Sequence, residues 1–257
     1  MAYRKFIASL ILFALLTLWL GAGCDSSTRG IVEVVKSEKL VESGIDHYDA
    51  GEYDEAQSSF KRAALEMPDS AEPFYWIART FEAQGDADKA LKYYDAAIER
   101  NPTYIEAMDA AAALTTQKAD WETTLRYRRR IVELNPTDAI SQNNLGFVYL
   151  AVGDYERAEP VFQKAINLGD DLARSWNGLG LVYDAQSETA KAVVALEKSV
   201  AAAPERMDSQ VHLGLVYEKA GEPEAASAAY TRALNIEKTG PLAELAAARL
   251  VELGYAP

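Results

Sequence analysis

The sequence of 257 residues contains one cysteine, Cys24, and two histidines, His47 and His212, which lie far apart in the chain. One cysteine cannot form a disulfide bond within the chain, and two distant histidines give no cluster of metal ligands. The sequence also lacks a glycine-rich phosphate loop, a nucleophile elbow and an H-E-x-x-H motif. These absences predict a protein that is not an enzyme and that uses no cofactor or metal.

Basic residues are also scarce. The chain has 26 Lys and Arg against 39 Asp and Glu, which gives a formal net charge of -13. An acidic surface repels phosphates, so a general nucleic-acid binder is excluded. The stretch LRYRRR, residues 125–130, is the exception. Its i, i+4 pairs Glu122–Arg126 and Arg129–Glu133 predict internal charge balance, with an acidic partner or lipid headgroups as the alternative.

The N-terminus holds a long apolar run. Residues 1–5 supply two positive charges, and the 15 residues from Phe6 to Leu20 are almost wholly apolar. A membrane-spanning helix needs about 20 residues, so this run is short for one and is typical of an export signal.

Cys24 follows the apolar run after the small residues Gly21, Ala22 and Gly23. This order resembles bacterial lipoprotein signals, although Gly21 stands where that family prefers an aliphatic residue. The resemblance implies a signal peptide over 1–23, lipidation of Cys24 with palmitate-type chains, and a lipid-anchored tether over 24–36. It places the protein in a bacterial cell envelope, facing the periplasm, without distinguishing the inner from the outer membrane. Ordinary signal cleavage is the alternative.

From Ser37 onward the sequence repeats every 34 residues without insertion or deletion. Small residues at a fixed place allow two helices to pack closely, and aromatic residues at other places fill the space beside them. A glycine followed by an acidic residue ends the first helix of most blocks and starts the second. The eighth place of the six blocks holds Gly44, Ala78, Ala112, Gly146, Gly180 and Gly214.

These features resemble the tetratricopeptide repeat (TPR). The fourth block, AISQNNLGFVYLAVGDYERAEPVFQKAINLGDDL, carries the L-G-x-x-Y, G-D-Y and F-x-x-A elements of that family. The resemblance implies an all-α, right-handed α-solenoid of six helix pairs with a C-terminal capping helix and tail over 241–257. The six repeats, together residues 37–240, are 37–70, 71–104, 105–138, 139–172, 173–206 and 207–240.

Four positions depart from the pattern. His47 stands where other repeats have an aromatic residue, so we expect a packed side chain. Arg128 falls at a normally buried place, so the helix is expected to shift its register and bury Tyr127 instead. Pro160 lies inside a second helix and is expected to kink it. His212, on a first helix, is at most a groove contact.

The TPR resemblance implies a concave face lined by the first helices, chiefly through places 2, 5, 9, 12 and 13. Three consecutive repeats have a large apolar residue at the ninth place, namely Phe147, Leu181 and Leu215, and Leu150 and Val211 extend the strip. Apolar groups aligned in this way predict a docking groove for a partner helix or extended segment. Coverage of the same residues by neighbouring helices is the alternative.

Asparagines accompany the strip. Asn143 and Asn177 occupy the fifth place, and Asn144 the sixth, where some peptide-binding TPR proteins hold the peptide backbone. An amide both donates and accepts hydrogen bonds, which suits sequence-tolerant binding. By contrast, Glu38, Glu72 and Glu82 stand at groove positions of the first two repeats and would repel a C-terminal carboxylate.

These features predict a non-catalytic interaction scaffold, anchored to an envelope membrane, that docks a segment of an envelope protein. One specific form resembles the pilotins that assist the localisation and assembly of type IV pilus secretin subunits. Another is an adaptor for peptidoglycan-modifying enzymes. An enzyme acting from the groove and a self-associating coat are hypotheses of different classes.

Overall fold

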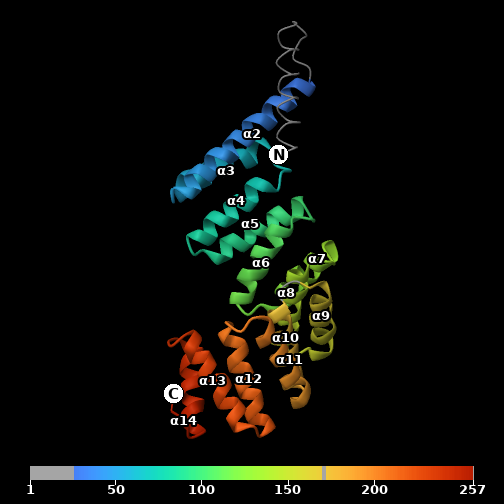
Figure 1. Ribbon diagram of the computed structural model, residues 1–257. Helices are drawn as coiled ribbons and strands as arrows, with labels where there is room; N and C mark the ends of the chain where they lie inside the picture. Colours follow the sequence, from blue (N-terminus) through green and yellow to red (C-terminus); the bar gives the residue numbers. More distant parts are fainter. Residues whose placement is uncertain (1–25, 170–171, 257) are drawn as a thin grey trace. The chain divides into compact units, whose positions relative to one another are not determined.

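The computed structural model describes residues 26–169 and 172–256. These residues form thirteen α-helices and no strand (Figure 1). The all-α class predicted from the repeat is therefore confirmed. The predicted signal peptide and Cys24 lie outside the described residues.

The chain divides into two compact units, residues 1–114 and 115–257. In the first unit, each helix packs on the next from α2 to α5. The helices of this unit are α2 (Ser26–Asp49), α3 (Tyr53–Glu66), α4 (Glu72–Ala83), α5 (Ala87–Arg100) and most of α6 (Ile105–Gln117).

In the second unit, consecutive helices pack on one another from α7 to α14. The last helix, α14, buries Ala243, Ala246 and Leu250 against α13, as expected of a capping helix. The helices of this unit are α7 (Trp121–Leu134), α8 (Ala139–Ala151), α9 (Tyr155–Leu168), α10 (Leu172–Ala185), α11 (Thr189–Ala202), α12 (Met207–Ala220), α13 (Pro223–Ile236) and α14 (Pro241–Glu252).

The first described helix is longer than the sequence predicts. Residues 24–36 were expected to form a tether, but α2 begins at Ser26 and runs for 24 residues. Gly30 is the weakest helix former in the segment before the first repeat, and a lone glycine costs only about 1 kcal/mol in a helix. Because these residues lie outside the 34-residue period, the repeat pattern could not reveal their helical state.

The turns within the repeats share one backbone conformation. Repeats 3 and 5 lack the turn glycine, and Ala119 and Ser187 adopt left-handed φ angles of 54° and 63° there. Such a conformation costs a non-glycine residue about 1–2 kcal/mol, so the packed helices impose the turn on these two sequences. The other repeats have φ between 76° and 79° at Gly51, Gly85, Gly153 and Gly221.

The eighth place packs against an aromatic ring, as the sequence predicts. A Cβ built on Gly146 would lie 2.8 Å from Cε1 of Phe162 and one on Gly214 would lie 2.5 Å from Cε1 of Tyr230. Both rings are fully buried. Elsewhere in repeat 3, the eleventh and twentieth places are joined by a hydrogen bond, which Thr124 Oγ1 donates to Thr115 Oγ1 at 2.8 Å.

The departures from the repeat have mixed outcomes. The packing expected of His47 is wrong: its side chain is 36% exposed, and its Nδ1 lies 2.6 Å from Oε2 of Glu52. The expected register shift buries Tyr127, but Arg128 is buried beside it, at 9% exposed. Pro160 lies inside α9, which continues to Leu168; the kink stays a prediction.

Arg129 and Arg130 of the cluster on α7 contact other groups of the protein. The expected pair Arg129–Glu133 is wrong, and Glu122–Arg126 stays a prediction. Arg129 Nε donates to the hydroxyl of Tyr149 at 2.9 Å, and Glu133 instead pairs with Arg130, at 3.1 Å. The guanidinium of Arg129 also lies 5.5 Å from the centre of the Tyr149 ring.

Candidate docking surface

Three predicted groove residues occupy equivalent points on α8, α10 and α12. The side chains of Phe147, Leu181 and Leu215 are each partly exposed, as is that of Leu150. Phe147 meets the Phe162 ring edge to face, with centroids 5.0 Å apart. Phe147, Leu150 and Leu215 also pack against core clusters. We call the four side chains of Phe147, Leu150, Leu181 and Leu215 the apolar strip.

Val211 does not belong to this surface. Its side chain is 0% exposed and lies in a core cluster with Tyr230 of α13 and Leu250 of α14. The capping helix contributes to this cluster, so packing at the end of the repeats covers a residue that the repeat pattern alone places in the groove. The apolar strip is therefore narrower than the sequence predicts.

The two asparagines at the fifth place are also buried, at 1% exposed for Asn143 and 3% for Asn177. Asn143 Nδ2 donates to Ser175 Oγ at 2.8 Å, and Asn177 Oδ1 lies 2.9 Å from Nδ1 of His212. Both amides therefore bridge the first helices of neighbouring repeats instead of facing a peptide. Asn144 is partly exposed, which makes it the amide of this group that a partner could reach.

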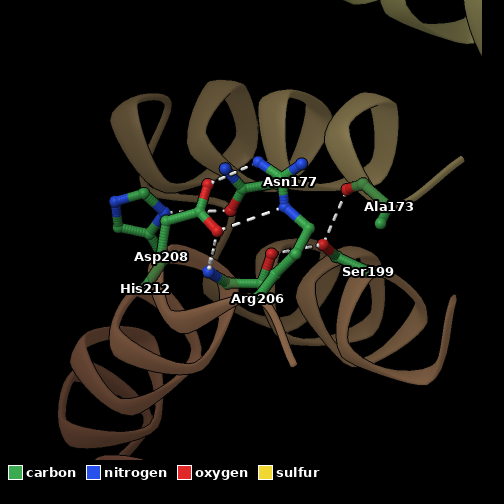
Figure 2. A network of polar contacts seen from close by, with 7 residues as sticks. Ala173, Asn177, Ser199, Arg206, Asp208 and His212 are labelled. Carbon is green, nitrogen blue, oxygen red and sulfur yellow. Dashed lines mark hydrogen bonds and ion pairs between the residues drawn. The ribbon is translucent and has the colours of Figure 1, made fainter. Parts of the chain in front are cut away.

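A polar network continues from Asn177 across the base of α12, as Figure 2 shows. Arg206 Nη2 lies 2.7 Å from Oδ2 of Asp208. Burial opposes ionisation, but the hydrogen bond and charge of Arg206 hold the pKa of Asp208 below its usual value. Ser199 Oγ donates to the carbonyl of Ala173 at 2.7 Å, which ties α11 to α10. The network fixes α10, α11 and α12 to one another.

His212 is a structural member of this network. Burial lowers its pKa, against the opposing charges of Asp208 and Asp184. The neutral imidazole then donates from Nδ1 to the amide oxygen of Asn177, which explains its place on a first helix. His212 was expected at most to contact a partner in the groove, but its hydrogen bond to Asn177 instead joins repeats 5 and 6.

Charged groups occur on the same three helices as the strip. Lys219 Nζ pairs with both carboxylate oxygens of Asp184, at 2.6 and 2.7 Å. The guanidinium of Arg174 lies 5.1 Å from the centre of the Phe147 ring. A segment docked on the strip would therefore meet apolar contacts and charges of both signs.

The first unit has a second surface, which the repeat pattern does not predict. Tyr75 packs against Tyr104 at 5.1 Å between ring centroids, and Tyr48 meets Trp76 at 5.8 Å. All four rings are partly exposed. We call them the aromatic face.

Within residues 26–169 and 172–256, no group of three His, Cys, Asp or Glu side chains is arranged to hold a metal ion. Across the same ranges, no helix combines the length and the apolarity needed to cross a membrane.

Two tetratricopeptide repeat models match the chain, one over residues 41–105 and 177–244 and the other over 137–205. Together with the helix pairs described above, these matches show that the chain belongs to the tetratricopeptide repeat family.

Solved structures agree with this assignment. A tetratricopeptide repeat protein from Parabacteroides merdae has a TM-score of 0.70 at 18% identity, covering 85% of this chain and 92% of that one. PilF of Pseudomonas aeruginosa has a TM-score of 0.63 at 13% identity, covering 82% and 96%. YrrB, a TPR protein with an unusual peptide-binding site, has a TM-score of 0.57 at 19% identity, covering 72% and 95%. At these identities the likeness shows the fold alone.

A curated relative matches a shorter stretch. The biofilm formation methyltransferase WspC of Pseudomonas putida is 35% identical over 65 residues, which is 25% of this chain. The chain spans only 15% of the length of that protein.

Proposed function

We propose that this protein is a non-catalytic docking scaffold that holds a segment of a partner protein on the apolar strip. The observation that carries the proposal is the alignment of Phe147, Leu181 and Leu215 at one level of three successive first helices, each partly exposed. Aligned apolar side chains on a surface suit an amphipathic helix or an extended segment. The peptide-binding site of YrrB is consistent with such a use of the fold.

The strip is suited to docking because its supports are rigid. Phe147 rests on the buried ring of Phe162, and the network of Asn177 and His212 fixes the neighbouring helices. A surface that does not reorganise loses less free energy on binding.

The test is a crosslinked pull-down from envelope membranes with the double variant Phe147→Glu and Leu181→Glu. We expect partner capture to fall at least tenfold. The matched control is Leu65→Glu with Val194→Glu, two apolar side chains that are 81% and 50% exposed on second helices. Equal capture by both variants and the parent would contradict the proposal, provided that circular dichroism shows all three folded.

We further propose that Cys24 anchors the scaffold to a bacterial envelope membrane, facing the periplasm. The single cysteine after a short apolar run supports this proposal. Because α2 begins at Ser26, two residues after Cys24, the anchor would be coupled to the repeats through a helix. Cys24→Ser is expected to release the protein from membranes; full retention of a variant of unchanged size would refute the anchor.

A finer form of the proposal is a pilotin for a type IV pilus secretin, and an adaptor for peptidoglycan-modifying enzymes is another. The architecture of an anchored repeat protein supports both, and the pull-down separates them by the partner that it captures. An enzyme working from the groove would instead show hydrolase or transferase activity without a stable partner.

A further inference from the structure

The first unit concentrates negative charge. Residues 36–114 carry eight Lys and Arg against 17 Asp and Glu, a net charge of -9. Residues 115–257 carry 15 against 20, a net charge of -5 over a longer stretch. The aromatic face and the apolar strip therefore stand in different electrostatic environments.

Three glutamates accompany the aromatic face. Glu38, Glu72 and Glu106 occupy the second place of three consecutive repeats. Glu72 and Glu106 lie in the first turns of α4 and α6, and Glu38 lies in the middle of α2. Burial raises the pKa of Glu72, a hydrogen bond from Trp76 opposes this, and the charge of Glu38 raises it further. Burial likewise raises the pKa of Tyr104, and the charges of Glu72 and Glu106 add to it. The glutamates and the rings thus lie within one another's electrostatic field.

Within the part of the chain whose side chains the structure describes, no ion pair compensates these three glutamates. None of the three pairs there with Lys, Arg or His. The guanidinium of Arg79, which contacts the rings of Tyr48 and Tyr75, also pairs with Glu82, with Nε and Oε2 3.6 Å apart. The face therefore keeps its negative charge.

Arg79 also shows that these rings accommodate a cation. Its guanidinium carbon lies 6.0 Å from the ring centres of both Tyr48 and Tyr75, and Nη1 donates to the Tyr75 hydroxyl at 3.1 Å. Cation–π contacts of this kind contribute about 0.5–2 kcal/mol, depending on how far the cation is desolvated.

We propose that the aromatic face and its three glutamates bind an extended polypeptide segment that carries Lys or Arg side chains. The rings of Tyr75 and Tyr104 receive the aliphatic and cationic parts of these side chains, and Glu38, Glu72 and Glu106 pair with the charges. Charge complementarity selects this occupant, since the same carboxylates repel nucleic acid and anionic lipid. The aromatic face shares no residue with the apolar strip, and this proposal does not depend on the strip.

Fluorescence anisotropy with the full chain in detergent tests the proposal. The probe is a labelled 12-residue peptide with lysine at every third position and Gly, Ser or Thr between, compared with the same peptide carrying glutamate for lysine. We expect the lysine peptide to bind and the glutamate peptide not to bind. Absence of lysine-peptide binding to the folded protein would overturn the proposal.

Two pairs of variants separate a site from general attraction to an acidic protein. Glu38→Gln with Glu72→Gln should weaken lysine-peptide binding at least tenfold, while Glu55→Gln with Glu99→Gln, which removes the same charge from exposed positions on α3 and α5, should change it less than twofold. Equal weakening by both pairs would refute a site. Phe147→Ala with Leu181→Ala should leave the affinity for the lysine peptide unchanged. Failure of this proposal can therefore be distinguished from failure of the proposal for the apolar strip.

Discussion

Gly178 of α10 faces the ring of Phe162 on α9 so closely that a Cβ on the glycine would overlap Cε1 and Cζ of the ring. Gly146 of α8 faces the same ring. Phe162 is therefore enclosed between two glycines of successive first helices, directly beneath Phe147 of the apolar strip. The packing beneath the proposed docking surface therefore requires glycine at positions 146 and 178.

We accordingly expect Gly178→Ala to destabilise the protein by about 1–3 kcal/mol, because overpacking a full core forces shifts of ring or backbone. Urea unfolding followed by circular dichroism measures the change. Adding Phe162→Leu, which shortens the opposing side chain, should recover part of the loss in a double-mutant cycle. If the effects of the two substitutions were fully additive, the contact between positions 178 and 162 would not be the cause of the lost stability.

The capping helix gives a second prediction. Arg249 of α14 pairs with Glu218 of α12, which also accepts a hydrogen bond from Tyr230. We expect Arg249→Met to loosen α14 and to cost about 1–2 kcal/mol, the range of a charge-assisted hydrogen bond that is partly open to water. Hydrogen exchange should rise in residues 241–252 first. Unchanged protection there would contradict the role assigned to the pair.

Glu218 makes this contact pH-dependent. The hydrogen bond from Arg249 holds the pKa of Glu218 below its ordinary value of 4.5. The folded pKa is the lower one, so the stabilisation is complete above the unfolded pKa and is lost as the pH falls through the folded value. Thermal unfolding between pH 6 and 3 should show a steeper loss for the parent chain than for Glu218→Gln.

His212 predicts a dependence at higher pH. Burial lowers its folded pKa below 6.5, so its contribution is complete above 6.5 and is lost as the pH falls toward the folded value. We expect the melting temperature to fall between pH 7.5 and 5.5, and His212→Gln to reduce the slope while keeping a donor to Asn177. An equal slope in both proteins would assign the pH dependence to other groups.

For Glu72, we expect a pH dependence of stability with the opposite sign. Burial raises its folded pKa, so the group favours folding below the unfolded pKa and this contribution is lost as the pH rises through the folded value. Glu72→Gln should therefore stabilise the protein at pH 7, by less than about 1 kcal/mol because the carboxylate is exposed to water. A melting temperature at or below that of the parent would show that the carboxylate is not strained in the fold.

The sequence was sufficient for the fold because the eighth-place residue and its aromatic partner recur at a constant spacing. Gly146 facing Phe162 is the direct outcome of that spacing. Gly178 was missed because it lies at the sixth place, where other repeats have side chains. Gly178 must lack a side chain because Phe162 of the preceding repeat packs against it. Comparison of equivalent places in the repeats does not reveal such a contact between repeats.

The candidate surfaces were harder to predict than the fold. Val211 and Asn177 occupy groove places of the repeat, yet the capping cluster buries the first and a bridge to His212 uses the second. The aromatic face was missed because Tyr48, Tyr75 and Tyr104 occupy the twelfth, fifth and thirty-fourth places, so no column of the repeat lines them up. Packing between repeats brings them together.

The central claim is that the apolar strip is where a partner docks. Site-specific photo-crosslinking in envelope membranes tests it most directly, with the photoreactive residue placed at Leu181 or at Val194, which is 50% exposed on α11. We expect a discrete crosslinked partner from Leu181 and none from Val194. The same adduct from Val194 alone, or from neither position in a folded and correctly localised protein, would contradict it.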